Sequence, residues 1–201
     1  PMVPVSKLCD KQAKDAKQIF PNEIHPNAQI HPTAFIADHN VRIGAGTIIE
    51  PHAVIMPDVQ LGENCLIRSG AVLGSDNFSK FRSRNGLVTG AYSIQGVRIG
   101  DEVEIGYNSC IDKGDSGMDT CIGAGTKIHN LCQVSHGAQL GKDCILWGGV
   151  FLSGFCELAD RVQIQPSSVV SNYVKIGADA YIGIHSVVTH DVEAGKTFLG
   201  S

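Results

Sequence analysis

Large aliphatic residues recur at every sixth position along most of this chain. One run covers residues 122–188, an earlier one covers 43–73, and a short one covers 99–111. A fixed short period is typical of a solenoid, and a period of six predicts a parallel β-helix. We expect each hexad to form one face of a triangular coil with its aliphatic inside, so three hexads, or 18 residues, complete one turn. The aliphatics are Ile43, Ile49, Ile55, Leu61, Ile67, Leu73, Ile99, Ile105, Ile111, Ile122, Ile128, Val134, Leu140, Leu146, Leu152, Leu158, Ile164, Val170, Ile176, Ile182 and Val188.

Two other positions of the hexad are also restricted. The position four residues after the aliphatic holds a small side chain, and the position directly after it is often glycine, as at Gly44 and Gly123. We interpret these glycines as corner residues that need a positive φ. The seven cysteines are an odd number without a CxxC pair, which argues against a disulfide framework and a zinc ribbon. Four of them occupy the small position, where we expect buried apolar side chains: Cys65, Cys132, Cys144 and Cys156.

The repeat divides the chain into a short N-terminal capping segment, residues 1–21, and one β-helix domain, residues 22–201. Two insertions interrupt the period, at 74–97 and 112–121, and we expect both to project as loops. The first is polar but carries aromatics, which are costly on a loop unless they cover something, so we favour a functional role over a tolerated surface loop. Its aromatics are Phe78, Phe81 and Tyr92.

Composition excludes several classes of partner. The formal net charge is −4, so no basic surface suggests nucleic acid. No run of eighteen apolar residues is present, which argues against a membrane span. The first residues lack the apolar core and cleavage site of a secretory signal, so we expect a cytoplasmic protein.

The candidate chemistry centres on His136, which lies two residues after Val134, where a side chain should point out of the coil. Counting by 18 places His136 beneath Gly154, and Gly154 beneath Asn172. A histidine can act as a general base, and the backbone N–H of an adjacent glycine can stabilise an oxyanion. These are the parts of an acyl-transfer site.

A metal site is the alternative for the histidines. His129 lies seven residues before His136, and the same counting places it beneath Trp147. No third histidine lies nearby in sequence, so we expect no zinc site. His129 could orient His136, bind substrate, or be a polar corner residue.

Two segments carry a resemblance to a known family. GVRIGDEVEIGYNSCIDKG at 96–114 and IGAGTKIHNLCQVSHGAQLGKDC at 122–144 resemble the UDP-3-O-acylglucosamine N-acyltransferase family of lipid A (lipopolysaccharide) biosynthesis. The resemblance implies a left-handed β-helix that assembles as a homotrimer. It also implies transfer of an acyl chain from acyl carrier protein to the amine of a UDP-sugar at a subunit interface. No tightly bound cofactor is implied, because the acyl thioester is a co-substrate.

The resemblance also assigns roles to residues. His136 corresponds to the general base and the backbone N–H of Gly154 to the oxyanion donor, while Asn130 and Gln133 correspond to polar groups that contact substrate. His129 stands where the family has an aspartate, Tyr173 where it has a second histidine, and Trp147 where it has a small residue near the acyl channel. Asn172 joins these as a substrate-binding candidate. The family's N-terminal domain, which holds the uridine, has no counterpart among the residues before the coils.

We therefore predict an N-acyltransferase that uses a thioester of acyl carrier protein or coenzyme A and a sugar or sugar-nucleotide acceptor. One alternative is a coenzyme A-dependent acetyltransferase acting on another small amine or hydroxyl, and a second is a non-catalytic hexapeptide scaffold. Trp147 leaves two interpretations open. Its indole could shorten the acyl pocket, or it could pack on the neighbouring subunit.

Overall fold

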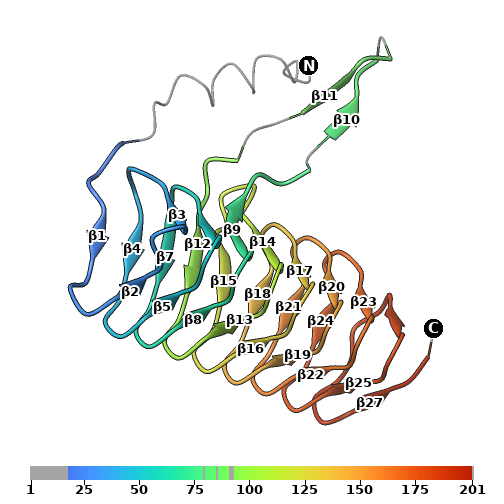
Figure 1. The fold of residues 1–201 in the computed structure, drawn as a ribbon. Coiled ribbons are helices and arrows are strands. Elements are labelled where there is room, and N and C mark those ends of the chain that lie inside the picture. Colours follow the sequence, from blue (N-terminus) through green and yellow to red (C-terminus); the bar gives the residue numbers. More distant parts are fainter. Residues whose placement is uncertain (1–17, 79, 85, 91–92, 201) are drawn as a thin grey trace.

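A computed structural model describes residues 18–78, 80–84, 86–90 and 93–200. The capping segment predicted for 1–21 falls largely outside these residues, as does Tyr92. The described chain is all-β, and Figure 1 shows its coils stacked along one axis with a hairpin projecting from them.

Three parallel sheets form the faces of the coil, as the hexad period predicts. The first, sheet A, contains β1 (Glu23–Ile24), β4 (Arg42–Ile43), β7 (Val59–Leu61), β12 (Val97–Ile99), β15 (Thr120–Ile122), β18 (Gln139–Leu140), β21 (Glu157–Leu158) and β24 (Lys175–Ile176). The second, sheet B, contains β2 (Gln29–Ile30), β5 (Ile48–Ile49), β8 (Leu66–Ile67), β13 (Glu104–Ile105), β16 (Lys127–Ile128), β19 (Ile145–Leu146), β22 (Gln163–Ile164), β25 (Tyr181–Ile182) and β27 (Thr197–Phe198). The third, sheet C, contains β3 (Phe35–Ile36), β6 (Val54–Ile55), β9 (Val72–Ser75), β14 (Cys110–Asp112), β17 (Gln133–Val134), β20 (Phe151–Leu152), β23 (Val169–Val170) and β26 (Val187–Val188).

The aliphatic of each hexad pairs in register with the aliphatic one coil further on. Val134 lies opposite Leu152, and Leu152 lies opposite Val170. All three side chains are fully buried, in a core that runs continuously along the axis. Stacking therefore buries what no single coil can bury. The predicted left-handed parallel β-helix is confirmed.

The prediction for the corner glycines is wrong. The left-handed conformation falls three residues after the aliphatic, at Gly46 and Gly125 but also at non-glycine residues such as Asn64 and Phe155. Glycine directly after the aliphatic has a different cause, which is the close approach of the next coil. A Cβ on Gly44 would lie 2.4 Å from the carbonyl oxygen of the glycine stacked above it, so only glycine fits there.

The small position four residues after the aliphatic also has a hydrogen-bonding role. Ser168 Oγ donates to the carbonyl of Gly183 at 2.7 Å, and Thr126 Oγ1 donates to that of Gly141 at 3.0 Å. Cysteine does the same more weakly, because Cys144 Sγ lies 3.2 Å from the carbonyl of Ala159. The four cysteines in this position are buried as predicted, and Cys65, Cys132 and Cys144 each lie close to such a carbonyl.

Both insertions leave the coil at the same corner, between a sheet C strand and the next sheet A strand. The first runs from β9 to β12 and the second from β14 to β15. The strands extend one or two residues into the predicted insertions at each end, so both insertions are slightly shorter than predicted. The first holds an antiparallel hairpin of β10 (Lys80–Arg82) and β11 (Val88–Gly90), which extends away from the coils (Figure 1). The corner between sheets C and A is therefore the elaborated edge of the molecule.

Candidate active site

The corner that carries both insertions also carries His136. This residue lies between β17 and β18, one coil above the second insertion. A pocket of about 440 Å³ opens beside it. Its walls come from the first insertion, from the end of β14 and from the next three coils: Asp76, Phe78, Asp112, Gln133, Ser135, His136, Phe151, Ser153, Gly154 and Asn172.

The stacking of His136 and Gly154 is close enough to require glycine. A Cβ on Gly154 would lie 2.5 Å from His136 Nε2 and 2.8 Å from Cε1. The imidazole therefore lies directly against the bare backbone of Gly154. The structure thus brings together His136, Gly154, Gln133 and Asn172, four of the residues singled out in the sequence.

One aromatic ring packs against the imidazole, and a second ring stacks on the first. Phe155 meets His136 edge to face, with ring centroids 5.1 Å apart, and stacks in parallel on Tyr173 at 5.3 Å. The Phe155 ring lies over Gly137, where a Cβ would be 2.5 Å from it. Tyr173 is 68% exposed and is not among the residues that line the pocket, so it contacts His136 only through Phe155.

A carboxylate lies on the inner side of the pocket. Asp112, at the end of β14, accepts a hydrogen bond from Ser75 Oγ at 2.7 Å. Burial raises the pKa of Asp112, while the Ser75 hydroxyl, the Gln133 amide and the positive charge of a protonated His136 oppose that increase. Asp112 and His136 line the same pocket.

The two insertions brace one another around this pocket. Asn77 Nδ2 donates to Asp115 Oδ2 at 2.7 Å, and Lys113 N–H donates to the Ser75 carbonyl at 2.8 Å. Gly96 N–H donates to Asp119 Oδ1 at 2.7 Å, so the second insertion also fastens the return of the first. These bonds fix Asp76 and Phe78 at the mouth of the pocket.

Three candidates lie elsewhere within the chain. His129, Asn130 and Trp147 lie at the corner between sheets B and C and line a separate pocket of about 460 Å³. The His129 and Trp147 ring centroids are 6.2 Å apart, as stacking by 18 predicts, and Asn130 Oδ1 accepts the Tyr107 N–H at 2.9 Å. Within one chain His129 and His136 therefore line different pockets.

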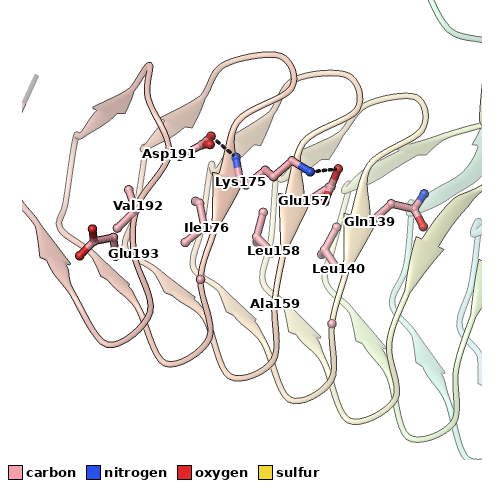
Figure 2. A pocket seen from close by; sticks show the side chains of 12 residues that line it. Gln139, Leu140, Glu157, Leu158, Ala159, Lys175, Ile176, Asp191, Val192 and Glu193 are labelled. Atoms are coloured by element: carbon pink, nitrogen blue, oxygen red, sulfur yellow. Dashed lines mark hydrogen bonds and ion pairs between the residues drawn. The ribbon is translucent and has the colours of Figure 1, made fainter.

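A third hollow, of about 570 Å³, lies along sheet A (Figure 2). Small residues in successive coils, Gly141, Ala159 and Gly177, leave the space. Its charged groups satisfy one another, because Lys175 Nζ pairs with Glu157 at 3.0 Å and Lys175 N–H donates to Asp191 at 2.8 Å. Its lining contains no histidine or thiol, so it is not a candidate for acid–base or thiol chemistry.

Within the described residues, no group of three or more His, Cys, Asp or Glu side chains is arranged to hold a metal ion. That part of the chain also contains no helix long and apolar enough to cross a membrane.

Asp112 and Phe155 were not predicted from the sequence, although a signal for each is present. Phe155 lies 18 residues after Gly137 and 18 before Tyr173, so simple counting stacks it between them. Asp112 is harder to place, because the second insertion lengthens the chain between stacked residues and the 18-residue spacing fails before Val134. Counting hexads rather than residues pairs Ile111 with Val134, as observed, and so places Asp112 beneath Ser135.

A triangular coil of hexads with a histidine pocket at one corner defines a hexapeptide-repeat protein. Residues 40–75 match the family described as bacterial transferase hexapeptide (six repeats). Within that class, the chain is similar to curated proteins named UDP-3-O-acylglucosamine N-acyltransferase. A probable mitochondrial UDP-3-O-acylglucosamine N-acyltransferase 2 of Arabidopsis thaliana is 33% identical over 73% of this chain and 48% of its own length. The enzyme of that name from Methylorubrum extorquens is 35% identical over 79% of this chain and 42% of its own.

The chain thus spans about half the length of these curated relatives. Solved structures confirm the fold. The UDP-N-acetylglucosamine acyltransferase of Francisella novicida superimposes with a TM-score of 0.74 at 23% identity, over 89% of this chain and 65% of its own. The UDP-N-acetylglucosamine O-acyltransferase of Moraxella catarrhalis gives 0.72 at 24% identity, over 88% and 71%.

Proposed function

We propose that the protein transfers an acyl group from a thioester to the amine of a sugar or sugar nucleotide, with His136 as general base. The observation that carries this proposal is the stacking of the His136 imidazole on the bare backbone of Gly154. The relatives named as UDP-3-O-acylglucosamine N-acyltransferases support the class of reaction and of acceptor.

The proposed reaction follows from the positions of these groups. The acceptor nitrogen attacks the thioester carbonyl, and His136 Nε2 takes the amine proton as the N–C bond forms. The carbonyl oxygen becomes an oxyanion, which the Gly154 N–H stabilises. Collapse of this intermediate breaks the C–S bond, and the leaving thiolate takes the proton from the imidazolium. No resident cofactor is required, because the thioester supplies the acyl group.

The Gly154 amide is suited to this role by its place in the hexad. At several hexads the amide two residues after the aliphatic points outward and donates to a side chain of the next coil. Tyr107 N–H donates to Asn130 Oδ1 at 2.9 Å, and Lys142 N–H donates to Asp160 Oδ1 at 2.8 Å. By analogy the Gly154 N–H is directed towards the side of Asn172, where the pocket is open.

Asp112 would stabilise the imidazolium that forms during transfer. Its carboxylate lines the same pocket as His136, and Ser75 Oγ donates a hydrogen bond to it. An adjacent negative charge favours the protonated form of histidine. We assign Asp112 as a positioning and electrostatic residue, and Gln133 and Asn172 as candidates for contacts with substrate.

We also propose a cytoplasmic homotrimer in which each site is completed by a neighbouring chain. The outward positions of sheet C are largely apolar, with Phe151 and Val187 both 42% exposed, whereas those of sheet A are largely charged or polar. The pocket of His129, Asn130 and Trp147 opens at the other edge of sheet C. A trimer packed through sheet C would set this pocket against the His136 pocket of the neighbour, where Trp147 could limit the length of the acyl chain.

Thiol release tests the proposed function. Wild type and His136→Ala are assayed with a panel of acyl thioesters on acyl carrier protein and coenzyme A and with a panel of amino-sugar nucleotides. We expect activity in wild type and a decrease of about 10²-fold or more in the variant, because a general base is lost. Unchanged activity in the variant would place the base elsewhere.

The donor preference separates the alternatives. A preference for acetyl-coenzyme A with other small amines or hydroxyls would support the acetyltransferase alternative. Absence of thiol release with every pair would favour the non-catalytic scaffold.

A further inference from the structure

We propose that the hairpin β10–β11 and the described residues of its turn, 80–84 and 86–90 and hereafter the arm, form a docking surface for an acidic carrier protein that delivers the acyl thioester. This inference rests on the proposed function, and it concerns a surface outside the pocket.

The charge of the arm is opposite to that of the chain. The protein has a net charge of −4, yet no carboxylate occurs between Asp76 and Asp101. The arm itself carries Lys80, Arg82 and Arg84, all of them exposed. No carboxylate of the described residues forms an ion pair with any of the three. The arm therefore presents uncompensated positive charge on an otherwise acidic molecule.

The described part of the arm exposes hydrophobic side chains, and its strands pair with no strand of the coils. The two strands pair only with each other, and Leu87 and Val88 are 65% and 63% exposed. Lys80 and Arg82 lie two residues apart on one strand, so they share a face of the hairpin, and Arg82 pairs with Val88 across it. An isolated two-stranded hairpin is only marginally stable in water. A mixed basic and apolar surface of this kind fits a folded partner with a carboxylate-rich patch.

The position of the arm connects this surface to the chemistry. Phe78, two residues before β10, lines the His136 pocket together with Asp76. The bond between Asn77 and Asp115 fixes this root to the second insertion. A carrier protein bound along the arm would thus hold its thioester at the mouth of the pocket. A free small thioester would reach the same pocket without touching the arm.

Charge reversal tests the proposal. In Lys80→Glu/Arg84→Glu, Arg82 is kept because its Nη1 donates to the Gly86 carbonyl at 2.8 Å and closes the turn. We expect binding of holo acyl carrier protein, measured by calorimetry at low salt, to weaken at least tenfold. The neutral variant Lys80→Gln/Arg84→Gln should give an intermediate loss. Added salt should weaken binding by wild type and have less effect on the reversed variant, because exposed charge pairs are screened.

The matched control is Lys142→Glu/Lys196→Glu, which makes the same change of charge at exposed sites away from the arm. It should change carrier-protein binding by less than about twofold, a small electrostatic effect. The specificity constant kcat/KM for S-acyl pantetheine should be the same in all variants, while kcat/KM for the acyl carrier protein donor should follow the binding.

Several outcomes would overturn the proposal. They are no binding of carrier protein by wild type, equal losses in reversal and control, and a change of oligomeric mass on reversal, which would mean that the arm packs on a second copy. An equal loss of kcat/KM with S-acyl pantetheine would mean that the arm affects the His136 pocket itself. An equal loss with acyl-coenzyme A alone would mean that the arm binds the nucleotide phosphates of coenzyme A. Binding that depends on the arm without thiol release from any donor would refute the proposed function and leave the docking surface standing.

Discussion

The imidazole of His136 lies where it does because the residue above it has no side chain. The Cβ of any other residue at position 154 would overlap Nε2, so the position of the base and the accessibility of the oxyanion donor depend on one glycine. Neither group is informative alone, since eight histidines and 23 glycines occur in the chain. Their stacking was predictable because the register of a solenoid is set by a count.

Gly154→Ala should therefore impair catalysis without unfolding the coil. We expect kcat/KM to decrease by about 10²-fold, the usual cost of losing an oxyanion donor or of displacing a reacting group by about 1 Å. The measurement is thiol release, together with a thermal melt. Gly148→Ala is the control, because it occupies the same position in the preceding hexad and its Cβ would meet His129 Nδ1 at 3.2 Å. Equal activity in the two variants would contradict the assignment.

Asp112→Asn should show opposite effects on stability and activity. Burial raises the pKa of Asp112 above its unfolded value of about 3.9, so its ionisation opposes folding. This penalty is absent below the unfolded pKa, grows as the pH rises, and is complete above the folded pKa. The variant should thus melt above wild type at pH 7 and at the same temperature as wild type near pH 3. Its kcat should be about tenfold lower, because the imidazolium loses its counter-charge.

Calorimetry at the two pH values checks the stability effect. A variant that melts below wild type at pH 7 would show that the hydrogen bonds of the Asp112 carboxylate outweigh its burial.

At the scale of the element, the hexad determined most of what could be predicted. The three faces, the inward aliphatics and the buried cysteines all follow from a local pattern that repeats without exception inside each run. The reason for the corner glycines did not follow, because it depends on the distance to the next coil. The hairpin within the first insertion did not follow either, because it lies outside the repeat. Nor did the separation of His129 from His136, which requires assigning each hexad to a face.

The small position of the hexad offers a test of the weak thiol hydrogen bonds. Cys144→Ser should change the free energy of unfolding by less than about 1 kcal/mol, because the hydroxyl keeps an acceptor at Ala159, as Ser168 keeps one at Gly183. Cys156 lies between Ala138 and Val174 in register, and burial raises the pKa of its thiol to about 12. Cys156→Ser should cost about 1–3 kcal/mol, since it buries a hydroxyl among apolar groups. Urea unfolding of Cys144→Ser and Cys156→Ser measures the two changes in the free energy of unfolding. Equal changes would contradict the prediction that only the Cys156 site lacks an acceptor for a hydroxyl.

At the scale of the whole molecule, the apolar outer surface of sheet C should hold three chains together. Sedimentation should give the mass of three copies of the 21.4 kDa chain. Val187→Lys places a charge on this surface outside the pocket and should shift the protein to smaller species. Gln163→Lys, in the equivalent outward position of sheet B, is the control and should leave the mass unchanged. A trimer that survives Val187→Lys would place the interface on another face.

Because each coil bonds only to the coils directly before and after it, length along the axis is a free variable of this architecture. The pocket draws on the coils between β9 and β23 and on no residue beyond Asn172. A descendant could therefore gain or lose a whole turn near its C-terminal end and keep its active site. A single-residue deletion within a strand would instead turn the aliphatic of that hexad outward, because successive side chains of a strand point to opposite faces. The length of the β-helix can therefore change by whole turns, while smaller changes of chain length are confined to the corner between sheets C and A, where the insertions already lie.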